Sequence, residues 1–65
     1  MLKSRVKEVM EKKGLTFSDL EKKTGLARET IRRARNEKIS DCSLKTLYKI
    51  ALALGVKVQD LFVQD

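Results

Sequence analysis

The stretch from Gly25 to Lys38, GLARETIRRARNEK, holds four arginines and one lysine. On a helical wheel of about 100° per residue, its polar and apolar side chains separate onto two faces. An arginine fork matches the N7 and O6 edge of guanine, an asparagine can pair with adenine, and a glutamate can accept from the cytosine amino group. The polar face could therefore read base edges or be an ordinary solvated surface; it holds Arg28, Glu29, Arg32, Arg33 and Asn36, opposite Ala27, Thr30, Ile31 and Ala34.

The overall charge of the chain favours a polyanionic partner. Lysine and arginine total 15 against 9 acids, which gives a net charge of +6 in 65 residues. Nucleic acid, an acidic protein and an anionic membrane surface are all consistent with that charge. The longest apolar run, Ile50 to Leu54, is five residues and too short to span a bilayer. We therefore expect no membrane-spanning segment, and the N-terminus lacks the apolar core of a signal peptide, which favours a cytoplasmic location.

Catalytic and metal-binding chemistry have few residues to draw on. The chain has no histidine, and Cys42 is its one cysteine. No Cys/His zinc site or internal disulfide can form, and no histidine can activate the thiol. We therefore expect no enzyme activity, no metal, no cofactor and no small-molecule ligand, and we interpret Cys42 as a small packing residue.

Glycines and capping residues divide the chain, residues 1–65, into the helices of one small domain. Gly14, Gly25 and Gly55 each follow an aliphatic segment, as helix C-cap glycines do. The spacing of Leu2, Val6, Val9 and Met10 predicts a first helix that ends near Lys13. Thr16, with Asp19 as a weak capping box, predicts a second helix over 17–24, and a third is predicted over 27–36.

The second half of the chain predicts two more helices. NEKISDCS reads as a polar loop, and Ser43 is expected to cap a fourth helix over 44–54. VKVQDLF alternates as a strand would, but without a partner strand a short closing helix is favoured, with Leu61 and Phe62 in the core. The prediction is an all-α fold of five helices. The fourth should be central, through an apolar stripe of Leu44, Leu47, Tyr48, Ala51 and Leu54, widened by Ile50 and Leu52.

Two segments of this sequence resemble the helix-turn-helix proteins of the phage repressor and Cro type, the XRE family. TFSDLEKKTGLARETIRRARNEK is similar to the family's helix-turn-helix, and LYKIALALGVKVQDLF is similar to its closing signature. The resemblance runs from Val6 to Phe62 and implies a five-helix, lambda-repressor-like domain with the helix-turn-helix in the second and third helices. The first segment matches at Thr16, Leu20, Gly25, Leu26 and Ile31, and the second at Leu47, Ile50, Ala51, Ala53, Leu54, Gly55, Val56, Val58, Leu61 and Phe62.

The resemblance also implies a function and a set of contacts. It implies a sequence-specific regulator of transcription that binds double-stranded DNA as a homodimer on an inverted repeat. Residues 61–63 and the fourth helix are candidates for the dimer surface, although the core is the favoured place for Leu61 and Phe62, which would leave Val63 and loop residues for weak pairing. The implied base-contacting residues are Arg28, Glu29 and Arg33, with Arg32 beside them, and the implied phosphate-contacting residues are Phe17, Asn36, Lys38 and Ser43.

The basic face leaves a second hypothesis open. A protein-interaction module, such as an antitoxin or an anti-repressor, could use the same face to bind an acidic protein. Strong attraction to DNA without sequence preference, together with tight binding to one protein, would favour that alternative.

Several positions depart from the family pattern. Phe17 stands where the family usually has a glutamine that contacts phosphate, Glu21 replaces a small alanine, and Ala27 replaces a capping serine. Met10 and Arg35 occupy positions where many relatives carry an ion pair, so that this pair cannot form. We expect Arg35 to extend over Met10 toward a phosphate or a nearby acid.

Overall fold

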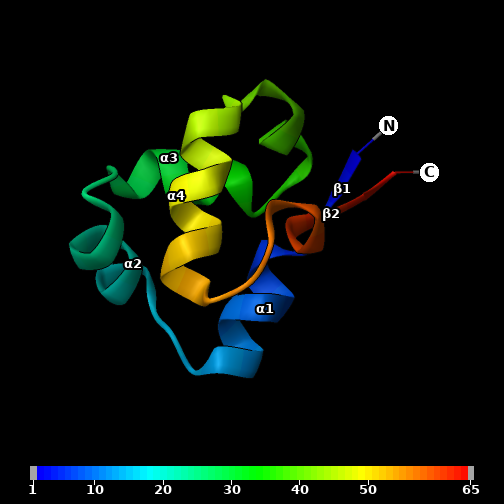
Figure 1. Cartoon of the computed structure of the whole chain (residues 1–65). Helices are drawn as coiled ribbons and strands as arrows, with labels where there is room; N and C mark the ends of the chain where they lie inside the picture. The colour runs from blue at the N-terminus through cyan, green and yellow to red at the C-terminus, as the bar shows by residue number, and fades with distance from the viewer. Residues whose placement is uncertain (1, 65) are drawn as a thin grey trace.

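Four α-helices, two short 3-10 helices and one two-stranded sheet form residues 2–64, the part of the chain that the computed structural model describes (Figure 1). Helix α4 packs against both α1 and α2, and α2 packs against α3. The two ends of the chain lie side by side at one edge of the molecule (Figure 1). In order, the elements are β1 (Leu2–Ser4), α1 (Val6–Lys13), α2 (Phe17–Thr24), α3 (Arg28–Ala34), η1 (Glu37–Asp41), α4 (Leu44–Leu54), η2 (Val58–Leu61) and β2 (Phe62–Gln64).

The small sheet corrects the all-α, five-helix prediction. Residues Leu2–Ser4 form a strand instead of the first turn of a helix, and they pair antiparallel with Phe62–Gln64. The closing helix is reduced to the single 3-10 turn of η2. Of the alternating segment VKVQDLF, only Phe62 joins a strand, because Val58–Leu61 form η2; strand β2 continues from Phe62 to Gln64 and does have a partner. That partner lies at the opposite end of the sequence, where local periodicity cannot reveal it.

The helix boundaries at α2 and α4 follow from their caps, as predicted. The hydroxyl of Thr16 accepts a hydrogen bond from the Asp19 N–H at 3.2 Å, and the Asp19 carboxylate accepts one from the Thr16 N–H at 2.8 Å. The hydroxyl of Ser43 accepts from the Thr46 N–H at 3.1 Å at the start of α4. Gly25 ends α2 with a φ of 74°, a left-handed conformation that an L side chain would strain.

The core draws on every helix of the described chain. Its largest fully buried side chains come from α1, α2, α3, η1, α4 and η2. Ile39 is among them, so NEKISDCS is not simply a polar loop: it winds into η1 and anchors it with one apolar residue. The largest fully buried residues are Val6, Leu20, Ile31, Ile39, Ile50 and Leu61.

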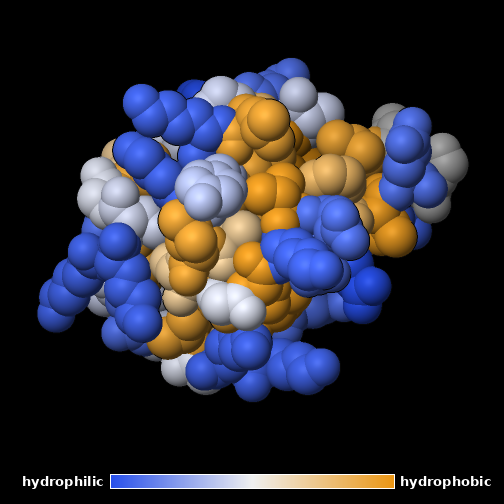
Figure 2. All heavy atoms as spheres, in the orientation of Figure 1, coloured by the Kyte–Doolittle hydropathy of each residue, from blue (hydrophilic) through white to orange (hydrophobic). Residues whose placement is uncertain are grey.

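Helix α4 buries only part of the stripe that was predicted to be central. Leu47, Ile50, Ala51 and Leu54 are buried, in agreement with the prediction. Leu44, Tyr48 and Leu52 are instead exposed by 72, 56 and 62 % respectively. They are spaced four residues apart and therefore share one outward face of the helix. In Figure 2, apolar residues gather at the surface over α4, which lies in front in this view.

The terminal sheet is tied to both the core and the end of α3. The Arg5 N–H donates to the Leu61 carbonyl oxygen at 2.7 Å, next to the sheet. The Ser4 hydroxyl donates to the carbonyl oxygen of Ala34 and accepts from the Val6 N–H. Ser4 therefore links β1 to the last residue of α3 and to the first residue of α1.

Candidate nucleic-acid interface

Helices α2 and α3 are joined by a tight turn built from local hydrogen bonds. The Gly25 N–H donates to the Glu21 carbonyl oxygen at 2.9 Å, and the Leu26 N–H donates to the Thr24 hydroxyl at 3.1 Å. Ala27 is extended, with a ψ of 151°, and its side chain makes no capping bond. Helix α3 therefore begins at Arg28 without the serine cap that is usual in the family, and the arrangement is helix, turn, helix.

The two faces of α3 are divided as the helical wheel predicts. Ile31 and Ala34 are buried and Thr30 is half-buried, which places one face against the core. Ala27, expected on that face, is exposed because it precedes the first turn. Helix α3 ends at Ala34, so Asn36 lies beyond it, where it caps η1. The predicted base-contacting residues all belong to α3 and are exposed: Arg28, Glu29, Arg32 and Arg33.

Glu29 is the common partner of two arginines on this face. Its carboxylate lies 2.8 Å from Arg32 Nη2 and 3.8 Å from Arg33 Nε. All three side chains are more than half exposed, so each pair contributes roughly 0–1 kcal/mol to stability. The pairs therefore matter less for stability than for where the two guanidinium groups point.

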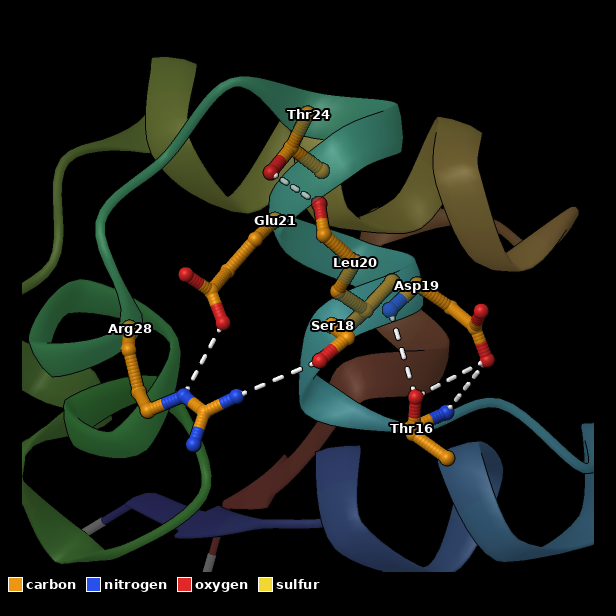
Figure 3. Close-up of polar contacts among 7 residues, drawn as sticks. All are labelled: Thr16, Ser18, Asp19, Leu20, Glu21, Thr24 and Arg28. Carbon is orange, nitrogen blue, oxygen red and sulfur yellow. Dashed lines mark hydrogen bonds and ion pairs between the residues drawn. The ribbon is translucent and has the colours of Figure 1, made fainter.

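Arg28 is held by α2 instead of by its own helix. Its Nε donates to Glu21 Oε1 at 2.9 Å, and its Nη2 donates to the Ser18 hydroxyl at a longer 3.4 Å (Figure 3). Figure 3 shows Glu21 extending from α2 across to Arg28, with the capping box of Thr16 and Asp19 at the start of the same helix. The replacement of a small alanine by Glu21 thus places a carboxylate within reach of the first residue of α3.

Phe17 lies against two arginines. The guanidinium carbon of Arg35 is 4.5 Å from the centre of the Phe17 ring, and that of Arg28 is 5.3 Å away. Both distances fall in the range of a cation–π contact. The ring has no hydrogen-bond donor, so a phosphate contact at this position would have to use the backbone N–H of the first turn of α2. Arg35 lies over an aromatic ring, and within residues 2–64 it forms no ion pair with an acid.

The other predicted phosphate contacts lie on the connection that follows α3. Asn36 Oδ1 accepts from the Lys38 N–H at 2.8 Å, which leaves the amide nitrogen of Asn36 without a partner among the described residues. The Lys38 side chain is exposed. The Ser43 hydroxyl is occupied at the start of α4, where it caps the helix and contacts Thr46 Oγ1 at 2.9 Å.

Sequence reasoning identified the exposed face of α3 and missed the residues of α2 that organise it. Ser18 and Glu21 were not predicted to contact Arg28, and the ring of Phe17 was not predicted to lie against arginines. Their spacing at 17, 18 and 21 places them on neighbouring parts of one helix surface, and this was the signal available in the sequence. That surface could be assigned to α3 only once the angle between the two helices was known.

Two groups near this surface, Asp19 and Cys42, have shifted pKa values. Hydrogen bonds from the backbone and hydroxyl of Thr16 hold the pKa of Asp19 below its ordinary value of 3.8. Burial raises the pKa of the Cys42 thiol, while the charge of Arg33 acts in the opposite direction. Over residues 2–64, no group of three or more His, Cys, Asp and Glu side chains is placed to hold a metal ion. No helix in that range is long and apolar enough to cross a membrane.

Residues 5–64 match the family model of the Cro/C1-type HTH DNA-binding domain. The chain belongs to this family. The match covers both the helix-turn-helix and the segment that closes the core, and it confirms the resemblance on which the site residues were assigned. The Cro/C1-type assignment makes the chain a helix-turn-helix protein of a DNA-binding family.

Relatives of this Cro/C1-type domain carry names that agree with the assignment. The chain is 38 % identical over 64 residues to an uncharacterized HTH-type transcriptional regulator of Archaeoglobus fulgidus. The aligned residues cover 98 % of this chain and 90 % of the relative. It is 39 % identical to one of Methanocaldococcus jannaschii, with 98 % of this chain and 96 % of the relative covered. No solved structure gives a significant match.

Proposed function

We propose that this protein is a sequence-specific regulator of transcription that reads double-stranded DNA with α3 in the major groove. The observation that carries the proposal is the exposed face of α3, which presents Arg28, Arg32 and Arg33 directly after a helix-turn-helix turn. In such motifs the second helix enters the major groove while the first crosses the backbone. The net charge of +6 supports the same partner.

Within this proposal the residues divide into two roles. Arg28 and Arg33 read base edges, where a bidentate arginine–guanine pair discriminates by about 1–3 kcal/mol against the wrong base. Glu29 holds Arg32 and Arg33 and contacts a base edge only through a free carboxylate lone pair. The backbone N–H groups at Phe17 and Ser43, the side-chain amide of Asn36 and the side chain of Lys38 contact phosphates, which position the protein without reading sequence.

We also propose that the regulator is a homodimer that pairs through the outward face of α4. Leu61 is buried and Phe62 half-buried, so most of that part of the predicted dimer surface belongs to the core. Leu44, Tyr48 and Leu52 are large, exposed and aligned on one helix, which starts directly after the phosphate-contacting residue Ser43. A second copy on this face would leave both α3 helices free for half-sites about 34 Å apart on an inverted repeat.

Selection of bound duplexes from a random DNA pool, followed by sequencing, tests the proposal. The experiment uses the full chain at about 150 mM salt, where purely electrostatic binding is weak. An inverted repeat with constant spacing is the expected result. An unbiased pool would contradict base reading by α3, and the acidic-protein partner would then become the better hypothesis for the basic face.

A further inference from the structure

The contacts of Arg28 use one edge of its guanidinium group and leave the other free. Nε donates to Glu21 Oε1 and Nη2 donates to the Ser18 hydroxyl, so both contacts fall on the side edge of the group. Figure 3 shows Nη1 on the opposite side, with no contact to the residues drawn. A guanidinium carries five N–H donors in one plane, and its end edge is formed by Nη1 and the second hydrogen of Nη2. This end edge is the fork that meets guanine N7 and O6.

We propose that Glu21, assisted by Ser18, positions Arg28 for bidentate recognition of a guanine. Helix α2 then sets the base preference of α3, besides packing against it. The inference rests on the proposed function, because it assumes that Arg28 reads a base. Glu21 is a positioning residue in this proposal, since it acts through Arg28 and touches no base itself.

Three features separate this contact from an ordinary surface ion pair. Glu21 is 35 % exposed, whereas the acids of the other ion pairs, Glu29 and Glu8, are 54 and 67 % exposed. The contact joins two helices, so it constrains Arg28 relative to α2, while the other ion pairs among residues 2–64 join residues only three or four positions apart in the sequence. The centre of the Phe17 ring lies 5.3 Å from the guanidinium carbon of Arg28, so the ring also restricts the conformations of the Arg28 side chain.

The carboxylate of Glu21 should have opposite effects on affinity and on selectivity. A negative charge near the helix that enters the groove repels phosphates, and it lowers affinity for every DNA sequence alike. An arginine that is already oriented loses less rotamer entropy when it meets guanine, which favours the correct base over the others. Removal of Glu21 should therefore raise affinity for mismatched DNA and lower the preference for guanine.

The test compares two duplexes that differ at one base pair. The first is the duplex recovered by selection, and the second changes the guanine whose preference is lost in Arg28→Ala. Affinities of the full-length parent, Glu21→Ala and Glu21→Gln are measured at the same salt. Glu8→Ala is the matched control, because it removes the same charge and an ion pair to Arg5, and that pair lies at the start of α1, away from Arg28 in the sequence.

Glu21→Ala is expected to lower the ratio of the two affinities about fivefold. Glu21→Gln keeps an oxygen acceptor for Nε and should lie between Glu21→Ala and the parent, while Glu8→Ala should keep the parent ratio. When Arg28 is already replaced by alanine, Glu21→Ala should leave the ratio of the two affinities unchanged. A merely structural role of Glu21 would not make its effect on this ratio depend on Arg28. If Glu21→Ala shifts both affinities equally and keeps the ratio, the inference is wrong.

The design separates failure of this inference from failure of the proposed function. If Arg28→Ala abolishes one guanine preference and Glu21→Ala does not weaken it, the positioning role alone is refuted. If Arg28→Ala leaves the selected sequence unchanged, Arg28 reads no base and the proposed base contact fails as well. Glu21→Gln, which retains the side-chain volume, supplies the same comparison if Glu21→Ala fails to fold.

Discussion

The guanidinium carbon of Arg35 lies 4.5 Å from the centre of the Phe17 ring. This contact connects the residue that directly follows α3 to the residue that begins α2. In the family pattern the position of Phe17 usually holds a phosphate-binding glutamine, and in many relatives the position of Arg35 takes part in an ion pair. In this protein, a cation–π contact between Arg35 and Phe17 takes the place of the phosphate-binding glutamine and of the ion pair.

Replacement of Phe17 by leucine tests that contact. Leucine retains an apolar side chain but removes the π-face, so Phe17→Leu should lower the free energy of unfolding by about 1 kcal/mol. Chemical denaturation of Phe17→Leu, Arg35→Met and the double variant measures the coupling. Strict additivity of the two single effects would mean that the contact contributes nothing.

Arg33 and Lys38 should respond differently to truncation. Arg33→Ala should cost about 1–3 kcal/mol on the selected duplex and relax the preference at one base position. Lys38→Ala should weaken binding to all sequences alike and reduce the slope of log affinity against log salt by about one. Titrations at several salt concentrations on matched and mismatched duplexes distinguish the two. Identical behaviour of both variants would argue against base reading by Arg33.

The capping box at the start of α2 should make stability depend on pH in acid. The pKa of Asp19 is lowered in the folded state, so its contribution is complete above the unfolded value of 3.8 and is lost as pH falls through the folded value. Asp19→Asn should remove this part of the acid dependence when unfolding is followed from about pH 6 to about pH 2. Thr16→Ala should cost about 1 kcal/mol at neutral pH. An acid profile of Asp19→Asn that is identical to that of the parent would contradict this role of Asp19.

The outward face of α4 should determine the oligomeric state. Tyr48→Glu places a charge in the middle of the exposed apolar stripe and should shift the protein to monomer in sedimentation experiments, with and without DNA. Lys49→Glu makes a larger charge change on the neighbouring exposed position and should leave the dimer in place. A parent chain that stays monomeric at high concentration on its selected duplex would refute pairing through this face.

Local signals in the sequence were sufficient for the central helices. The caps at Thr16 and Ser43 and the left-handed glycines at 25 and 55 each act within one helical turn, so α2 and α4 could be placed to the residue. The exposed face of α3 followed from periodicity for the same reason. The terminal strands could not be predicted, because Leu2 pairs with Gln64 and neither segment signals the other.

Two features of the molecule could not be predicted from the sequence, because they depend on how the helices are arranged in space. Apolar residues cover most of the circumference of α4, so periodicity alone could not show that Tyr48 and Leu52 face outward while Ile50 faces inward. The contact between Glu21 and Arg28 depends on how α2 crosses α3. The sequence of either helix alone contains no information about that crossing.

The pairing of Leu2 with Gln64 has a consequence for the unfolded chain. A covalent link between these two positions would close almost the whole polypeptide into a ring while keeping the pairing of the strands. Such a closure restricts the denatured ensemble far more than the folded one, and for a loop of this length the loss of chain entropy corresponds to about 4 kcal/mol. Ser4 would keep its hydrogen bond to the Ala34 carbonyl oxygen, so β1 would stay attached to the end of α3.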